Sequence, residues 1–137
     1  MTAVGRRLFL YGTLQPGTGH PHSDWLFALV DPLGPARARG ALWAIPDRQG
    51  WYPALVPGVG WVKGFLVAAT SRLDAAAWAR LDAFEAGYRR AALTLEDGST
   101  VEAWVWAKDL PDGARPIAGG DYRAWLTETG LPPYRGA

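Results

Sequence analysis

Glu85 is the residue of this sequence best placed to transfer protons. It follows Leu81 by four positions and Ala77 by eight, so on a helix it lies at the edge of the apolar stripe that faces the core. Burial among apolar side chains raises the pKa of a carboxyl group, which makes a glutamate a usable proton acceptor and donor near neutral pH. The pattern also allows a simpler role, an ion pair with Arg89 or Arg90 or exposure at the helix end.

A second candidate is the segment Tyr11-Gly12-Thr13-Leu14, where an apolar strand ends in glycine and a hydroxyl residue follows. Successive backbone N–H groups in such a turn converge on an anion, here a carboxylate or an oxyanion. No lysine follows and no G-x-G-x-x-G pattern is present, so the segment is not a phosphate loop. A turn without any binding role is the alternative.

The other polar patterns do not complete a catalytic or metal site. His20, His22 and Asp24 share one loop, but a proline separates the two histidines and the chain has no third. No serine lies in a G-x-S-x-G context. Asp82, three residues before Glu85, suggests a hydrolase with two carboxylates, but its place off the apolar stripe favours a solvated or capping role. We expect no metal and no cofactor.

Composition restricts the class of protein further. The chain has 137 residues, no cysteine, 17 glycines, 11 prolines and 49% hydrophobic residues, which predicts one turn-rich domain over 1–137 without disulfides. The 14 basic and 13 acidic residues are scattered, which disfavours nucleic acid as a partner. No segment reaches the roughly 18 apolar residues of a membrane span, and the apolar run after Arg6-Arg7 is too short for an export signal. We expect a cytoplasmic monomer or weak homodimer with no membrane partner.

Glu85 and the 11–14 segment must be positioned by a mixed set of strands and helices. Apolar runs bounded by glycine and proline predict strands, and apolar residues three or four apart predict helices. The expected strands cover 8–11, 36–45, 51–56, 61–68, 88–95 and 100–107, the last two joined by an Asp97-Gly98 hairpin turn. The expected helices cover 25–29, capped by Ser23-Asp24, 71–85, capped by Ser71, and 121–128.

These elements predict an α+β fold. Five to seven strands form a small mixed β-barrel, with one main helix and short peripheral helices. The glycine- and proline-rich residues 130–137 are expected to form a flexible C-terminal tail.

Several motifs follow one another in a recognisable order over about residues 7–126. The run Leu8 to Leu14 contains Y-G-[ST]-L, and Leu81 to Arg90 contains L-D-x-x-E followed by Y-x-R. Apolar strand segments lie between them at 40–42, 51–55 and 62–66, and Gly-Gly-Asp-Tyr follows at 119–122. In this order and spacing the sequence resembles the γ-glutamylcyclotransferase-like superfamily, in particular its compact AIG2-like branch with γ-glutamylamine cyclotransferases.

The resemblance implies that the loop 11–14 holds a γ-glutamyl moiety, that Glu85 is the proton-transferring catalyst and that Tyr88 also contacts the substrate. The implied reaction is attack of the substrate's α-amine on its own γ-carbonyl, which releases 5-oxoproline and a free amine or amino acid. Such an intramolecular reaction requires positioning and proton transfer, without a cofactor. Residues 15–22 and the region of Trp25 are expected to shape the pocket for the leaving amine.

Two functions of different classes remain open from the sequence. One is this cyclotransferase, including its use to remove a γ-glutamyl group from an unusual amine in a biosynthetic pathway. The other is a non-catalytic barrel that binds a small metabolite or a partner protein. A carboxylate at position 85, where it costs stability, favours the enzyme.

Overall fold

The structure is a computed structural model, which describes residues 5–135 of the chain. Its strands are β1 (Arg7–Leu10), β2 (Val30–Asp47), β3 (Gly50–Ala69), β4 (Tyr88–Thr94), β5 (Thr100–Trp106) and β6 (Arg115–Pro116). Its helices are α1 (Pro21–Phe27), α2 (Ala75–Phe84) and α3 (Tyr122–Thr129).

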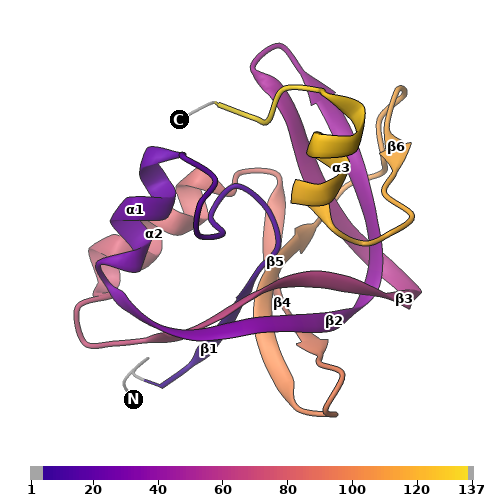
Figure 1. Cartoon of the computed structure of the whole chain (residues 1–137). Helices are drawn as coiled ribbons and strands as arrows, with labels where there is room; N and C mark the ends of the chain where they lie inside the picture. Colours follow the sequence, from indigo (N-terminus) through magenta and orange to yellow (C-terminus); the bar gives the residue numbers. More distant parts are fainter. Residues whose placement is uncertain (1–4, 136–137) are drawn as a thin grey trace.

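The strands form one mixed sheet that curls into a half-barrel (Figure 1). Their order is β4-β5-β1-β3-β2-β6, with β1 parallel to β5 and antiparallel to β3. A bridge between Ala38 of β2 and Leu95, directly after β4, brings the two sides of the curled sheet together. Helices α1 and α2 lie at one end of the sheet, and α3 lies at the other, beside the β2–β3 hairpin (Figure 1). The predicted α+β fold with a curled mixed sheet is confirmed.

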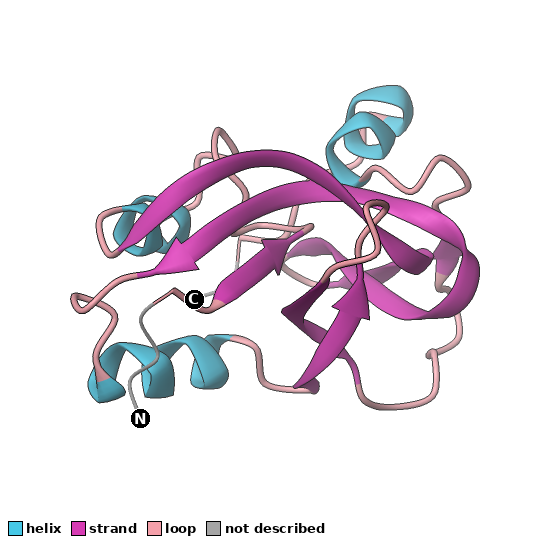
Figure 2. Ribbon diagram, turned by 90° about the horizontal axis from the view of Figure 1, so that it is seen from below, coloured by secondary structure: helices cyan, strands magenta, loops and turns pink. Residues whose placement is uncertain are grey.

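The prediction of three separate strands at 36–45, 51–56 and 61–68 is wrong. Two strands of 18 and 20 residues, β2 and β3, take their place and run along the whole molecule (Figure 2). The ladder pairs Arg39 with Trp61 and Ala41 with Val56, so residues 57–60 bulge out opposite Gly40. The Pro-Gly-Val-Gly segment therefore adds an irregularity within one strand, because β2 continues beside it, and does not form a turn between two strands.

Both sequence-derived caps of the first two helices are also wrong. The ring of His20 caps α1, since its Nδ1 accepts a hydrogen bond from the His22 N–H at 3.1 Å. Ser23 and Asp24 lie inside that helix, and the buried Ser23 hydroxyl donates to the Leu14 carbonyl at 3.1 Å. The helix thereby fixes the loop that follows β1.

Helix α2 begins later than predicted. Asp74 is its N-cap and accepts a hydrogen bond from the Ala77 N–H at 2.9 Å, whereas Ser71 lies in the preceding turn. A carboxylate at the cap is favoured by the free N–H groups of the first turn. The helix ends at Phe84 with Glu85 as its C-cap, and Gly87 follows with a φ of 95°.

The strand β1 is buried on both faces and separates two parts of the core. Phe9 packs in a cluster inside the curled sheet, which extends to Tyr122 and Trp125 of α3. Leu8 and Leu10 point the other way, into a cluster shared with α1 and α2. The unbroken apolar run in the sequence reflects this double burial.

The remaining elements follow the predictions more closely. Strands β4 and β5 pair antiparallel from Tyr88–Trp106 to Thr94–Thr100, with Gly98 at a φ of 86° in the turn. Helix α3 has Asp121 as its N-cap and ends at Gly130, which has a φ of 69°. The two-residue strand β6 pairs with Trp43 and Ala44 of β2 and was not among the strands predicted from the sequence.

Candidate active site

A cavity of about 230 Å³ lies where the segment after β1 meets the C-terminal end of α2. It is lined by Phe9, Leu10, Tyr11, Gly12, Thr13, Leu14, Asp47, Tyr52, Pro53, Phe84, Glu85, Ala86, Tyr88, Trp104 and Tyr134. All six candidate site residues from the sequence are in this lining: Tyr11, Gly12, Thr13, Leu14, Glu85 and Tyr88. The fold therefore brings the two sequence motifs together in one cavity.

Glu85 has the altered acidity that its position in the sequence suggests. Burial, followed by the nearby negative charge of Asp82, raises the pKa of the Glu85 carboxyl to about 8. Within residues 5–135 no basic side chain forms an ion pair with Glu85. Arg90 instead pairs with Asp82, with 3.2 Å between Nε and Oδ1, and Arg89 is exposed. Glu85 can thus exchange a proton near neutral pH.

Two tyrosines form fixed walls of the cavity. The Tyr11 hydroxyl donates to the Trp104 carbonyl at 2.5 Å and accepts from the Leu55 N–H at 3.4 Å. The Tyr88 hydroxyl donates to the Pro53 carbonyl at 2.5 Å. Burial is the main cause that raises the pKa of both tyrosines well above the ordinary value, and the charge of Glu85 adds to it. Both phenols therefore stay neutral and shape the site.

The loop 11–14 presents backbone donors. Its carbonyl groups accept hydrogen bonds from later residues: Gly12 from the Gln15 N–H at 3.1 Å, Thr13 from the Thr18 hydroxyl at 2.6 Å, and Leu14 from the Ser23 hydroxyl at 3.1 Å. The N–H groups of Gly12, Thr13 and Leu14 donate to no other residue among those described. N–H groups left free in a turn are donors for an anion.

Only glycine fits at position 12. A Cβ built there would lie 2.6 Å from Cγ of Pro53, a residue that lines the same cavity. The close approach of the loop to β3 thus depends on the absence of a side chain.

Nine further residues line the cavity, and three of them, Asp47, Tyr52 and Tyr134, bring polar groups that were not predicted from the sequence. Asp47 is the last residue of β2, and Tyr52 is the third residue of β3. The rings of Tyr52 and Tyr134 meet edge to face with centroids 5.5 Å apart. The alternation of side chains between the two faces of a strand along 50–56 would have assigned Tyr52 to one face. No local sequence pattern marks Asp47 or Tyr134.

Tyr134 reaches the cavity because the segment 131–135 is fixed to the start of β3. The Trp51 N–H donates to the Pro132 carbonyl at 2.9 Å, and the Tyr134 N–H donates back to Trp51 at 2.9 Å. Gly50 allows this contact, since a Cβ there would lie 2.1 Å from the Pro133 carbonyl oxygen. Residues 130–135 of the expected flexible tail are thus hydrogen bonded to the body of the protein, and residues 136–137 lie outside the described part.

Residues 5–135 contain neither a helix that could span a membrane nor a cluster of side chains that could hold a metal ion. The longest helix, α2, has ten residues, so no helix of this part of the chain is long enough to cross a membrane. No group of three or more histidine, aspartate or glutamate side chains in the same range is placed to hold a metal ion.

A curled mixed sheet with a glycine loop facing a helix-end glutamate defines a recognisable class of protein. The chain belongs to the family described as gamma-glutamyl cyclotransferase, AIG2-like, whose model matches residues 8–124. This range contains both motifs of the cavity, while Tyr134 lies beyond it.

Solved structures support the same fold. The c4763 protein of uropathogenic Escherichia coli is 26% identical, with a TM-score of 0.70, over 95% of this chain and 98% of that chain. The uncharacterized protein PH0828 from Pyrococcus horikoshii is 22% identical, with a TM-score of 0.68, over 91% and 96% of the two chains. The allophanate hydrolase of Kluyveromyces lactis is 15% identical, with a TM-score of 0.76, over 91% of this chain but only 21% of its own. No curated protein matches the sequence.

Proposed function

We propose that the protein is a γ-glutamyl cyclotransferase, which converts a γ-glutamyl compound into 5-oxoproline and a free amine. One observation carries the proposal: Glu85, whose carboxyl pKa is raised to about 8, lines the same small cavity as Gly12, Thr13 and Leu14, whose N–H groups donate to no other described residue. A proton carrier and a set of anion donors are the two functions that lactam formation requires of a protein.

Glu85 is the group that moves protons in this proposal. As a carboxylate it accepts a proton from the substrate's α-ammonium, which frees the nitrogen's electron pair to attack the γ-carbonyl carbon. The new C–N bond forms as the carbonyl π electrons move to oxygen. Protonated Glu85 then gives its proton to the departing nitrogen as the old C–N bond breaks. The electron pair on oxygen re-forms the carbonyl as this bond breaks. Glu85, again a carboxylate, takes the second proton from the new lactam nitrogen and passes it to the released amine, so that two protons in all move from the attacking nitrogen to the departing one.

The N–H groups of residues 12–14 stabilise negative charge. They bind either the α-carboxylate of the substrate or the oxyanion of the tetrahedral adduct. Because the loop carbonyls are already occupied, these donors need no rearrangement when charge develops. Tyr11 and Tyr88 form walls that hold the γ-glutamyl chain in the folded shape that brings amine and carbonyl together.

A panel of γ-glutamyl amines and γ-glutamyl dipeptides tests this function. Each compound is incubated with the protein, and 5-oxoproline and the free amine are measured by mass spectrometry. We expect the two products in equal amounts from at least one compound. Binding of such compounds without any 5-oxoproline supports the non-catalytic alternative and contradicts the proposal.

A further inference from the structure

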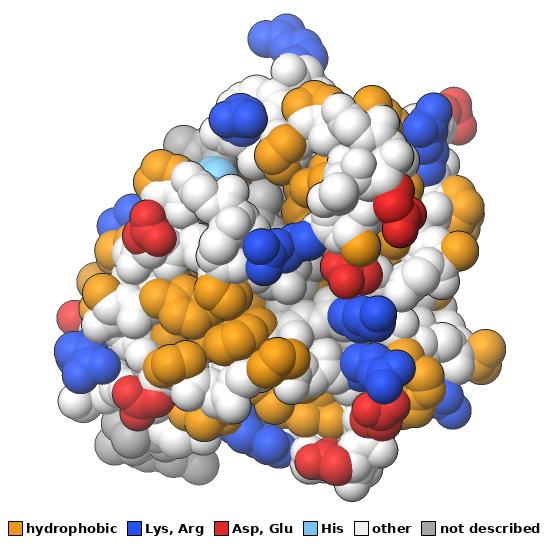
Figure 3. Space-filling model, viewed as in Figure 1, with side chains coloured by type: hydrophobic (Ala, Val, Ile, Leu, Met, Phe, Trp, Pro, Cys, Tyr) orange, Lys and Arg blue, Asp and Glu red, His pale blue; other side chains and the backbone are white. Residues whose placement is uncertain are grey.

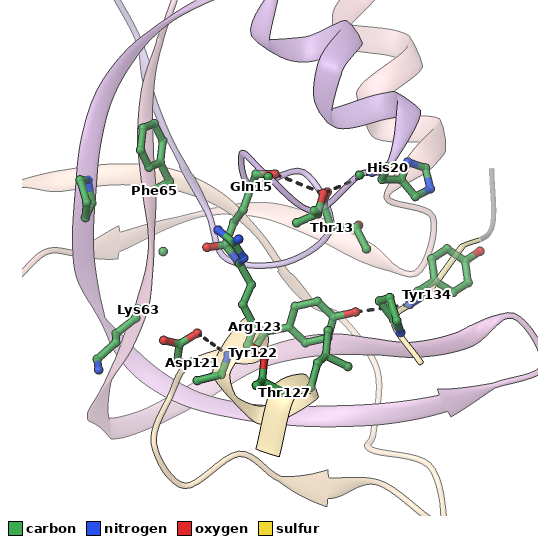
Figure 4. Close-up of a pocket in the computed structure, with 18 of the residues that line it drawn as sticks. Thr13, Gln15, His20, Lys63, Phe65, Asp121, Tyr122, Arg123, Thr127 and Tyr134 are labelled. Carbon is green, nitrogen blue, oxygen red and sulfur yellow. Dashed lines mark hydrogen bonds between the residues drawn. The ribbon is translucent and has the colours of Figure 1, made fainter. Parts of the chain in front are cut away.

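A groove of about 1180 Å³ adjoins the catalytic cavity. It runs between the loop 13–21, the middle of β3, helix α3 and the segment 130–135 (Figure 4). Thr13 and Tyr134 line both spaces, so the cavity and the groove meet at these two residues. A γ-glutamyl group in the cavity would therefore have its amide substituent directed into the groove. Residues 15 and 17–21 of the expected leaving-amine region line the groove, whereas Trp25 does not.

The two spaces differ in the kind of ionisable side chain that lines them. The charged side chains of the cavity are both acidic, Asp47 and Glu85. The groove is lined by four basic residues and two acidic ones: Arg37, Lys63, Arg123, Arg135, Glu96 and Asp121. Basic side chains gather along the middle of this face of the molecule (Figure 3).

Both acids of the groove are already engaged. Glu96 pairs with Arg37 at 3.4 Å, and the Asp121 carboxylate caps α3 through the Ala124 N–H at 3.1 Å. Lys63, Arg123 and Arg135 form no ion pair with any acidic residue in the described range. The groove therefore has positive charge available for an anionic group.

Arg123 is the basic residue of the groove that extends toward the loop containing Thr13, one of the two residues that line both spaces. Its guanidinium reaches from α3 toward Gln15 (Figure 4), and its Nη1 donates to the Pro16 carbonyl at 2.9 Å. Its Nη2 would lie 3.2 Å from a Cβ at Gly17. One hydrogen bond thus holds the side chain over the loop that continues from residues 12–14, while other N–H groups of the guanidinium remain to bind a ligand.

We propose that this groove binds the leaving-amine half of the substrate and selects an amine that carries a carboxylate, with Arg123 as the specificity-determining residue. The substrate class is then a γ-glutamyl amino acid or peptide, in preference to the γ-glutamyl derivative of a neutral or cationic amine. This inference rests on the function proposed above, because it needs the γ-glutamyl group in the cavity.

Two matched ligands test the inference: γ-glutamylglycine, which has the carboxylate, and γ-glutamylglycinamide, which has a neutral amide of nearly the same shape. We expect kcat/KM to be roughly fivefold higher for γ-glutamylglycine, as for a solvent-accessible ion pair. Arg123→Gln should remove most of this preference by raising KM for γ-glutamylglycine alone, and Arg123→Lys should restore part of it.

Arg39→Gln is the control. Arg39 is also exposed and also donates one hydrogen bond from Nη1 to a backbone carbonyl, that of Val59 at 2.9 Å, but it lines neither space. Arg39→Gln should leave the preference for γ-glutamylglycine over γ-glutamylglycinamide unchanged. Equal kcat/KM for both ligands overturns the inference. An equal loss for both ligands in Arg123→Gln also overturns it, because Arg123 would then only hold the loop.

Calorimetric titration of the two ligands into Glu85→Gln separates this inference from the catalytic proposal. The groove is supported as a carboxylate-binding site if γ-glutamylglycine binds more tightly than γ-glutamylglycinamide and if the Glu85→Gln/Arg123→Gln double variant loses this difference. This result holds even if the native protein forms no 5-oxoproline. Equal affinity for the two ligands, or no binding of either, contradicts the proposal that the groove selects a carboxylate. Turnover of both ligands without preference contradicts selection by the groove but agrees with the proposed cyclotransferase activity.

Discussion

The carboxylate of Asp82 accepts a hydrogen bond from the indole N–H of Trp104 at 3.0 Å, one helical turn before Glu85. Arg90 binds the same carboxylate. Asp82 is therefore held outside the lining of the cavity, which argues against a two-carboxylate hydrolase, but its charge still raises the pKa of Glu85. Arg90, which the sequence allowed as an ion-pair partner of Glu85, pairs with Asp82 instead.

Asp82→Asn should lower the pKa of Glu85, because it removes the like charge and keeps an oxygen that can accept from Trp104. With Glu85 as the base, kcat/KM rises with pH up to about 8 and then levels. In the variant this rise should move to lower pH by about half a unit, since burial is the larger cause. Measuring kcat/KM for 5-oxoproline formation as a function of pH gives the size of this shift. Asp112→Asn, at an exposed position that lines neither the cavity nor the groove, is the control, and coincident profiles for all three proteins contradict the role of Asp82.

Glu85→Gln should make the protein more stable at high pH. The folded-state pKa of Glu85 is raised from 4.5 to about 8, so its contribution to stability is fully present below 4.5 and is lost as the pH rises through about 8. We expect the variant to exceed the native protein by about 3 kcal/mol at pH 9 and to match it at about pH 4, with partial exposure reducing the full linkage value. Urea unfolding at both pH values measures the difference. An equal difference at the two pH values contradicts a raised pKa.

Gly12→Ala should lower kcat/KM by about a hundredfold, because the new methyl group pushes the loop donors away from the cavity. The Cβ would lie 2.6 Å from Cγ of Pro53. Gly119→Ala is the matched control, since nothing lies within 4 Å of a Cβ there and its φ is also ordinary. Steady-state kinetics and circular dichroism separate loss of activity from loss of fold. Full activity in Gly12→Ala would show that the N–H groups of the loop take no part.

Gly50→Ala should release the segment 131–135 and raise KM about threefold or more, since Tyr134 then leaves the wall of the cavity. Gly98→Ala is its control: both glycines have positive φ, 115° and 86°, but nothing lies within 4 Å of a Cβ at position 98. Each variant should lose about 1 kcal/mol of stability from backbone strain. Only Gly50→Ala should speed hydrogen exchange at the Tyr134 amide. Unchanged exchange and KM in that variant contradict a role for the segment.

The sequence was sufficient for features that depend on short-range pattern. The apolar stripe with Glu85 at its edge, the Asp97-Gly98 turn and a first strand directly before the loop 11–14 all follow from residue type and spacing. The structure contains each of them, although the first strand ends at Leu10 and not at Tyr11. The two motifs of the cavity could be paired only through the family resemblance, because no local rule places residue 12 beside residue 85.

The features of the fold and the cavity that were not predicted depend on contacts between segments distant in the sequence or on an uncommon cap. Proline and glycine at 57–60 are typical of a turn, but continuous pairing with β2 keeps them within one strand. Tyr134 follows a run that is typical of a loose terminus, and it reaches the cavity only because Gly50 leaves room for the Pro133 carbonyl. The His20 cap depends on a ring nitrogen, which is not among the common capping groups.

The release of 5-oxoproline by the native protein and by Glu85→Gln is the most direct test of the account. Glu128→Gln, on an exposed position of α3 outside both the cavity and the groove, is the control. With a γ-glutamyl compound that the native protein converts, we expect kcat in Glu85→Gln to fall by about a thousandfold while the fold is retained, and Glu128→Gln to keep the native rate. Native turnover in Glu85→Gln would contradict it.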